Sequence, residues 1–275
     1  MPELPEVETI VRDLSRSLIG RIFERTRAIR KDIIHGVAEP IDKVLPGCRI
    51  ENITRRAKRI IFELDGPTRM VVHLGMSGRL LLMPTRRAVA KHTHLRIAIR
   101  GVGLELRFVD PRRFGGVWLV SEKEGPTVGR VLGPLGPEPL DLSPARFARL
   151  LRRRRQIKAL LLDQRMIAGM GNIYCDEALH AAQVHPVTAA ETLNDSEAKR
   201  LLRVIKSTLN KAIRLNGSTM MDYRRANGDP GSFQNYHRVY QRAGRPCKKC
   251  GTQIERITVA GRSSFFCPAC QRLGV

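Results

Sequence analysis

Four cysteines near the C-terminus constrain the fold of this chain more than any other feature. Cys247 and Cys250 form one Cys-x2-Cys pair, and Cys267 and Cys270 form a second pair after sixteen intervening residues. Two such pairs at this spacing are the ligand set of a tetrahedral Zn²⁺ site, with each pair on its own tight turn. No histidine or carboxylate belongs to the pattern and no coordination position is left open. We therefore expect one structural zinc ion that stabilises a β-ribbon.

The charge of the chain indicates a polyanionic partner. Its 275 residues include 49 Lys and Arg against 26 Asp and Glu, a formal net charge of +23, while the hydrophobic fraction is an ordinary 42%. Folded domains of this charge favour nucleic acid, and a membrane surface is the competing polyanion. No apolar run approaches the roughly 18 residues of a spanning helix, and no signal peptide follows the N-terminus. We expect a soluble, cytoplasmic protein with no membrane partner.

Apolar periodicity divides the chain into a strand-rich part and a helical part. Apolar residues from Val7 to Leu18 recur at helical spacing up to Gly20, which predicts a first helix. Alternating residues between 21 and 120 predict antiparallel strands, with turns at Asp65-Gly66-Pro67 and Gly101-Val102-Gly103. Three prolines and two glycines then crowd residues 133–139 and predict a linker.

Beyond this linker the periodicity is helical. Ser143 followed by Pro144 is typical of a helix start. A longer helix is predicted from Ser196 to about Leu215, capped by Asp195 and closed by Asn216-Gly217. We therefore predict an α+β multidomain fold. Its parts are an N-terminal antiparallel β-sandwich with a flanking helix (1–132), a linker (133–141), a helical domain with a long polar loop at 217–235 (142–235), and a zinc β-ribbon (236–275).

The extreme N-terminus combines prolines and carboxylates in a way that allows two interpretations. Pro5 suits a helix start, and Glu6 suits the positive end of a helix dipole. That interpretation leaves Pro2 and Glu3 unexplained. If Met1 is removed, Pro2 becomes a secondary amine, a nucleophile that forms a charged iminium with a carbonyl-like carbon.

Several motifs together carry a family resemblance over essentially the whole chain. They are Pro2-Glu3-Leu4-Pro5-Glu6-Val7-Glu8, the loops 73–78 and 110–115, the string 157–186 around Gly169-Met170-Gly171-Asn172, and the ribbon hairpin 261–266. The sequence resembles the formamidopyrimidine-DNA glycosylase family, which includes endonuclease VIII. The resemblance implies a helix–two-turn–helix domain and a bifunctional DNA glycosylase/AP lyase. Such an enzyme excises oxidised purines (8-oxoguanine, formamidopyrimidines) through a Schiff base at an N-terminal proline, followed by β,δ-elimination.

The same resemblance assigns roles to individual residues. It implies Pro2 as the nucleophile, Glu3 as general acid/base, Glu6 as the residue that orients the nucleophile or its substrate, and Lys58 as a lysine near the damaged nucleotide. The residues implied to bind DNA are His73, Met76, His92, Arg112, Phe114, Lys158, Asn172 and Arg262, of which Met76, Arg112 and Phe114 would fill the space left by the extruded base. Its partner would be double-stranded DNA with oxidised bases or abasic sites, bound by a monomer in the nucleoid of a bacterial-type cell.

The residues alone leave other interpretations open. Met76 and Phe114 would ordinarily be core residues, the two histidines would be structural, and Asn172 would cap a helix after a tight turn. Within the family, an endonuclease VIII-type enzyme would prefer oxidised pyrimidines, and Ser232 stands in the lesion loop where an aromatic residue is commoner. In a different class, the chain would be a non-catalytic DNA-binding protein that uses its zinc ribbon and basic surface.

Overall fold

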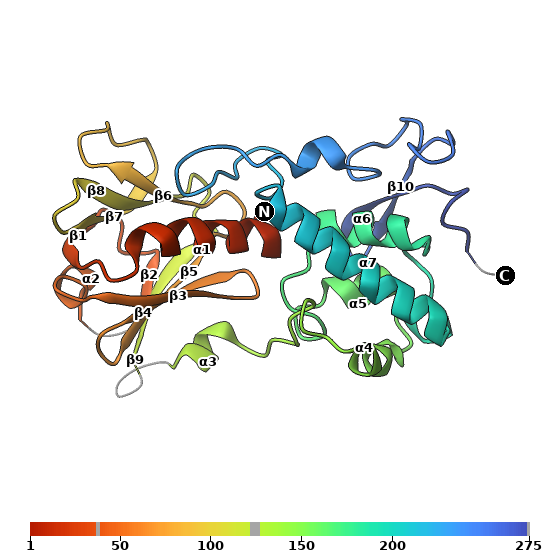
Figure 1. Cartoon of the computed structure of the whole chain (residues 1–275), viewed down its shortest axis with the longest axis horizontal. Coiled ribbons are helices and arrows are strands. Elements are labelled where there is room, and N and C mark those ends of the chain that lie inside the picture. The colour runs from red at the N-terminus through yellow and green to blue at the C-terminus, as the bar shows by residue number, and fades with distance from the viewer. Residues whose placement is uncertain (37–38, 122–126, 274–275) are drawn as a thin grey trace. The chain divides into compact units, whose positions relative to one another are not determined.

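A computed structural model of the chain describes residues 1–36, 39–121 and 127–273. The chain folds as two compact units. Figure 1 colours the chain from red at the N-terminus to blue at the C-terminus. Unit 1 comprises Met1–Gly133 and Leu215–Gln234, and unit 2 comprises Pro134–Arg214 and Asn235–Val275. Among the described residues, none of the helices has the length and apolar character needed to span a membrane.

Unit 1 is a β-sandwich with one long helix. Its helices are α1 (Leu4–Leu18), α2 (Ile41–Val44) and α3 (Val128–Leu132). Its strands are β1 (Phe23–Ala28), β2 (Ile34–Gly36), β3 (Ile50–Arg56), β4 (Arg59–Leu64), β5 (Thr68–His73), β6 (Arg79–Pro84), β7 (Thr93–Ile99), β8 (Leu104–Val109) and β9 (Gly116–Ser121). They form a four-stranded sheet in the order β1-β7-β8-β6 and a five-stranded sheet in the order β2-β9-β5-β4-β3.

Both predicted turns are confirmed. Asp65-Gly66-Pro67 joins β4 to β5, and Gly101-Val102-Gly103 joins β7 to β8, where Ile99 faces Leu104. Gly101 and Gly103 have φ angles of 75° and 62°, which glycine adopts without steric cost.

One strand pair departs from the predicted antiparallel arrangement. β2 runs parallel to β9, with Ile34 opposite Val117. This pair is a parallel exception at one edge of the predicted antiparallel sandwich. A strand of three residues has too few positions to show an alternating pattern, and its partner lies about eighty residues away in sequence, so no local signal fixed its direction.

The core of unit 1 explains why α1 forms where it does. Val7, Ile10, Leu14 and Leu18 of α1 are fully buried and belong to the same apolar cluster as residues of both sheets. Each such side chain contributes about 1.5–3 kcal/mol by leaving water. In addition, the Ser15 hydroxyl donates to a carbonyl of β3, and α1 lies along the sandwich in Figure 1. The apolar face of the predicted helix thus holds the chain's N-terminus in place.

Unit 2 contains a helical part and a two-stranded ribbon. Its elements are α4 (Pro144–Leu151), α5 (Ile157–Leu162), α6 (Asn172–Ala182), η1 (Ala190–Thr192), α7 (Asp195–Arg214), β10 (Glu255–Val259) and β11 (Arg262–Phe266), and η2 (Phe233–Tyr236) lies where the chain passes from unit 1 to unit 2. The Ser143 hydroxyl accepts from the Arg146 N–H, which confirms the predicted start of α4.

The predicted cap of α7 is wrong by one residue. Asn194, not Asp195, caps the helix, because its Oδ1 accepts from the Glu197 N–H while the Glu197 carboxylate accepts from the Asn194 N–H. This reciprocal pair is a capping box. After the helix, Asn216 and Gly217 have φ angles of 59° and 77°, as predicted for a helix end.

The proline- and glycine-rich segment after α3 packs closely within unit 2. The Gly136 N–H donates to the Gln164 carbonyl, and the Ala168 N–H donates to the Pro137 carbonyl. A Cβ at Gly136 would lie 2.5 Å from the Met166 carbonyl oxygen, so only glycine fits this approach. The domain boundaries given above stay predictions.

Candidate active site

The first turn of α1 buries both carboxylates that the sequence singled out. Glu3 is 2% exposed and Glu6 is 1% exposed, and Pro2 beside them is also buried. Glu6 Oε2 accepts from the Glu3 N–H at 2.8 Å, while the Glu3 carboxylate accepts from the Glu6 N–H. This capping box fixes the direction in which the chain leaves the helix, and with it the position of Pro2.

Glu6 also holds the long polar loop against α1. Its Oε1 accepts from the Ser218 N–H at 2.7 Å, and the Tyr223 hydroxyl donates to the Asn216 carbonyl at 3.0 Å. Gly217 has a φ of 77°, and a Cβ there would lie 2.8 Å from Glu6 Oε1. Glu6 therefore acts on two backbone segments at once, and its carboxylate is occupied by N–H donors.

The N-terminal amine lies in an environment that disfavours its charged form. Burial lowers the pKa of the Met1 amine below its ordinary value. Glu3 and Glu6 oppose this effect, whereas the positive charges of Arg112 and Lys58 add to it. An amine with a lowered pKa is more often unprotonated at neutral pH, which is the nucleophilic form.

Asp110 joins the two glycine-bounded loops. This carboxylate is fully buried, accepts from the Ser77 hydroxyl at 2.6 Å, and accepts from the Gly115 N–H at 2.8 Å. Ser77 belongs to the loop after β5, whereas Gly115 belongs to the loop between β8 and β9. A Cβ at Gly75 would lie 2.4 Å from the backbone of Phe114, so the loops touch where glycine leaves room.

The side chains at the tips of these loops point to solvent. Met76 is 40% exposed and Phe114 is 60% exposed, so neither is a core residue. The Arg112 guanidinium lies 5.6 Å from the centroid of the Phe114 ring, within cation–π range. Met76 and the stacked pair of Arg112 and Phe114 therefore point outward from loops that Asp110 holds together. A side chain that inserts into a nucleic acid must be exposed in this way.

The remaining predicted residues of unit 1 lie in different surroundings. Lys58, in the turn between β3 and β4, is 8% exposed. His73 ends β5, where burial lowers its pKa to about 4, with help from the charges of Arg59 and Lys58. A neutral His73 would contact a phosphate through a hydrogen bond, not an ion pair. His92, by contrast, is exposed and has a φ of 64° just before β7.

Unit 2 brings two of its predicted residues to one carbonyl oxygen. The Lys158 ammonium donates to the Ser263 carbonyl at 3.0 Å, and Asn172 Nδ2 donates to the same oxygen at 2.9 Å. Lys158 is fully buried, and its ammonium also lies 2.6 Å from Asp176 Oδ1. Burial raises the pKa of Asp176, which the neighbouring Lys158 opposes. Lys158 thus holds the ribbon backbone at Ser263 through a buried hydrogen bond. The interpretation of Asn172 as a helix cap is wrong, because Gly171 occupies that position.

Arg262 lies at the turn of the ribbon, directly before this carbonyl. It opens β11 opposite Val259, and its side chain is exposed. The turn residues Ala260 and Gly261 both have positive φ angles. Lys158 and Asn172 thus hold the strand next to Arg262, while Arg262 itself is left facing outward.

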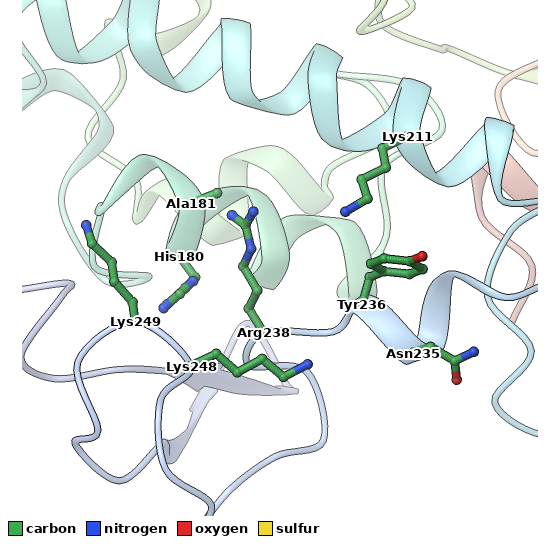
Figure 2. A pocket seen from close by; sticks show the side chains of 8 residues that line it. All are labelled: His180, Ala181, Lys211, Asn235, Tyr236, Arg238, Lys248 and Lys249. Carbon is green, nitrogen blue, oxygen red and sulfur yellow. The ribbon is translucent and has the colours of Figure 1, made fainter.

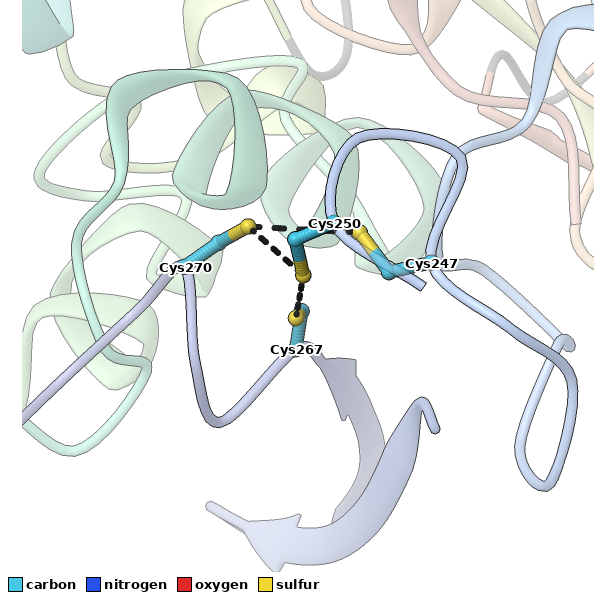
Figure 3. A group of neighbouring side chains, drawn as sticks. All are labelled: Cys247, Cys250, Cys267 and Cys270. Atoms are coloured by element: carbon cyan, nitrogen blue, oxygen red, sulfur yellow. Dashed lines mark hydrogen bonds between the residues drawn. The ribbon is translucent and has the colours of Figure 1, made fainter. Parts of the chain in front are cut away.

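The four cysteines meet at the end of the ribbon, as Figure 3 shows. Their Sγ atoms all lie within 4.8 Å of one another, with Cys250 3.4 Å from both Cys267 and Cys270. Zn–S bonds of about 2.3 Å in a tetrahedron require S···S distances of about 3.8 Å, which the cluster brackets. The residues therefore fit the predicted structural Zn²⁺.

Comparisons with known proteins agree along the whole chain. Residues 1–117 match the formamidopyrimidine-DNA glycosylase N-terminal domain, residues 135–224 its H2TH domain, and residues 244–273 a zinc finger found in FPG and IleRS. The formamidopyrimidine-DNA glycosylase of Herpetosiphon aurantiacus is 42% identical, over 98% of this chain and 100% of the relative. The chain belongs to the formamidopyrimidine-DNA glycosylase family.

Solved structures of family members extend this likeness to the fold. A Lactococcus lactis FPG mutant in complex with Fapy-dG containing DNA has a TM-score of 0.89 at 36% identity, covering 98% of this chain and 100% of that one. A MutM protein in complex with carbocyclic 8-oxo-G containing DNA has a TM-score of 0.88 at 36% identity, covering 98% and 100%. The predicted family fold, a β-sandwich with a helix, an H2TH domain and a zinc ribbon, is thereby confirmed.

Several residues that position the family's site in this chain were not singled out from the sequence. Asp110, Asp176 and Glu177 lie within motifs that carry the family resemblance, but neither the residues nor the resemblance indicates a role for them. The Glu177 carboxylate accepts N–H bonds from Arg238, Val239 and Tyr240, each at 2.9 Å. Ser77 lies 33 residues from Asp110, and Phe265 lies 89 residues from Asp176, so no local pattern indicates these partners.

A separate basic cavity of about 570 Å³ lies in unit 2 (Figure 2). Its lining residues are His180, Ala181, Lys211, Asn235, Tyr236, Arg238, Lys248 and Lys249. None of the predicted site residues of this glycosylase family member lines it. Two of its cations have partners within the protein, since Lys211 lies 4.2 Å from the centroid of the Tyr236 ring and the Lys248 ammonium donates to the His237 carbonyl.

Proposed function

We propose that this chain is a bifunctional DNA glycosylase/AP lyase that excises oxidised purines, 8-oxoguanine and formamidopyrimidines, from double-stranded DNA in base excision repair. The observation that carries the proposal is the buried Pro2-Glu3 pair at the start of α1. Burial lowers the pKa of the Met1 amine at this place, and the same surroundings would act on the Pro2 amine after removal of Met1, which equips a proline next to a carboxylate for nucleophilic catalysis. Two relatives of the chain, 42% and 40% identical to it, are named formamidopyrimidine-DNA glycosylase, which agrees with this proposal.

The chemistry follows from the two side chains. After removal of Met1, the Pro2 nitrogen attacks C1′ of the damaged nucleotide, and the base leaves with the electron pair of the glycosidic bond. The Pro2 nitrogen loses its proton, which the departing base takes up, Glu3 gives a proton to the ring oxygen as the sugar opens, and the nitrogen becomes an iminium. A carboxylate suits this task because it can both give and accept a proton within hydrogen-bond reach.

The iminium then drives cleavage of the strand. Its positive charge acidifies the neighbouring C2′ hydrogen, and loss of that proton expels the 3′ phosphate. A second proton loss expels the 5′ phosphate, and water finally hydrolyses the imine and restores the Pro2 amine. The role of Glu6 in this scheme is to hold Pro2 and the polar loop, because its oxygens are occupied by the N–H groups of Glu3 and Ser218.

DNA contacts would come from both units. In unit 1, Met76, Arg112 and Phe114 would enter the space left by the extruded base, and His73, His92 and Lys58 would contact the backbone nearby. In unit 2, Arg262 and Asn172 would bind phosphates, while the buried Lys158 would hold the ribbon strand that carries Arg262. The zinc ion supplies stability to this ribbon when bound. A DNA substrate, together with the bacterial sources of the relatives, supports a place in the bacterial cytoplasm on the nucleoid.

Borohydride trapping tests this proposal. The purified protein is mixed with duplexes that contain 8-oxoguanine, an oxidised pyrimidine or an abasic site, and the Pro2→Gly and Glu3→Gln variants serve as comparisons. Borohydride reduces an iminium to a stable amine, so a covalent protein–DNA adduct records the intermediate.

We expect adducts on the 8-oxoguanine and abasic duplexes that are lost in Pro2→Gly. Adducts mainly on the pyrimidine duplex would assign the endonuclease VIII type of specificity instead, for which Ser232 in the polar loop is the motivating residue. Tight, salt-sensitive DNA binding without any adduct would refute the proposed enzymatic activity and would indicate a non-catalytic DNA-binding protein.

A further inference from the structure

His180 lies against one of the cysteines of the zinc cluster. It is in the last turns of α6, is 4% exposed, and its Nε2 lies 3.5 Å from Cys247 Sγ. Cys247 itself is 3% exposed, so water does not compete for the contact. Figure 2 shows the His180 side chain between α6 and the segment that carries Lys248 and Lys249.

The other nitrogen of the ring identifies the direction of this hydrogen bond. Among the described residues, His180 Nδ1 is buried and has no hydrogen-bond partner. A neutral imidazole carries one N–H and one bare nitrogen. Placing the proton on Nε2 makes a bond to sulfur and leaves only a bare nitrogen unpaired, whereas the opposite tautomer would bury an unused donor. The geometry therefore favours Nε2–H as donor and the Cys247 sulfur as acceptor.

The position of His180 is fixed by its neighbours on α6. One turn earlier, Asp176 Oδ2 accepts from the Phe265 N–H of β11 at 3.1 Å. Glu177 accepts N–H bonds from the segment that leads into the first cysteine pair. Residues four apart share one face of a helix, so Asp176 and His180 both face the ribbon. The helix turn before the histidine is thus anchored to the ribbon by Asp176 and to the segment before the first cysteine pair by Glu177.

We propose that His180 is a positioning residue for the zinc site, donating an Nε2–H hydrogen bond to the Cys247 thiolate. A donated hydrogen bond stabilises the anionic sulfur in its metal-bound form, together with the Lys249 N–H, which lies 3.4 Å from the same sulfur. Losing such a partner typically weakens metal binding about 10–100-fold. The proposal concerns the ribbon and does not depend on which lesion the enzyme excises.

Zinc release from the full-length, zinc-loaded protein tests the proposal. His180→Phe keeps a ring but removes the donor, whereas His180→Gln places an amide N–H near the position of Nε2. We expect transfer of zinc to a colorimetric chelator to be about 10–100-fold faster in His180→Phe and close to the parent rate in His180→Gln. His185→Phe is the matched control, because the His185 ring packs on Phe266 of the same ribbon at 4.5 Å and its replacement should leave the rate unchanged.

Three results would overturn the assignment. Equal rates in all variants would show that the contact does nothing for the metal, and equally fast release from His180→Phe and His180→Gln would assign packing instead of hydrogen bonding. Nitrogen-15 NMR of the zinc-loaded parent decides the matter even if a variant fails to fold. We expect the His180 proton on Nε2, and a proton on Nδ1 alone would contradict the proposal.

Discussion

The carboxylate of Asp110 should be worth more to unit 1 than any other single polar side chain of the two loops. Asp110→Ala removes the acceptor of the Ser77 hydroxyl at 2.6 Å and of the Gly115 N–H at 2.8 Å, and the carboxylate that accepts both bonds is fully buried. Hydrogen bonds to a charged group contribute about 1.5–3 kcal/mol each. Two of them give an expected loss of about 3–6 kcal/mol in the free energy of unfolding of unit 1.

The assay is denaturant unfolding followed by the fluorescence of Trp118. This residue is the only tryptophan of the chain and lies on β9, so the signal reports unit 1. Asp65→Ala is the matched control, because Asp65 is exposed and accepts one N–H, from Arg49 at 2.8 Å, which should cost at most about 1 kcal/mol. We also expect Asp110→Ala to lose base excision, since the loops no longer hold their tips. A destabilisation no larger than that of the control would refute the reasoning.

Three further predictions concern the amine, the buried ion pair and the metal. Lys58 is one of the charges that lower the pKa of the terminal amine, so Lys58→Gln should raise that pKa. In a plot of the borohydride-trapping rate of Pro2 against pH, the rise in rate should then move to higher pH. A rise at unchanged pH would count against this coupling. Lys158→Met strands the buried Asp176 charge and should cost about 3–5 kcal/mol, whereas adding Asp176→Leu should restore much of it, as thermal unfolding of the single and double variants would reveal. Removing zinc with a chelator should abolish DNA binding but leave the fluorescence transition of Trp118 in place, and joint loss of both would show that the units do not unfold separately.

Local features of the sequence were sufficient for the elements whose determinants are local. Three examples are the apolar stripe of α1, the glycine-bounded turn between β7 and β8, and each of the two cysteine pairs. Within each of them the residues that matter are only a few positions apart, so their spacing was enough to predict the element. The cap of α7 was predicted one residue too late because two adjacent residues, Asn194 and Asp195, both have side chains that can cap a helix. Only the structure shows which one the Glu197 N–H reaches.

The features that the sequence did not indicate depend on contacts between distant segments. The parallel pairing of β2 with β9 and the bond from Ser77 to Asp110 each join residues far apart in the chain. The same holds for Lys158, which the family resemblance suggested as a DNA contact and which lies buried under the Ser263 carbonyl. A lysine in a sequence gives no sign of whether its ammonium will face solvent or a buried carboxylate, because that depends on the packing of the finished fold.

Locating the covalent bond is the most direct test of the account. After borohydride trapping on the 8-oxoguanine duplex, nuclease and protease digestion would leave a sugar remnant on one peptide, which mass spectrometry can identify. We expect the remnant on the nitrogen of Pro2, in a peptide that begins at that residue. A remnant on the Lys58 side chain, or on the amine of a retained Met1, would contradict it.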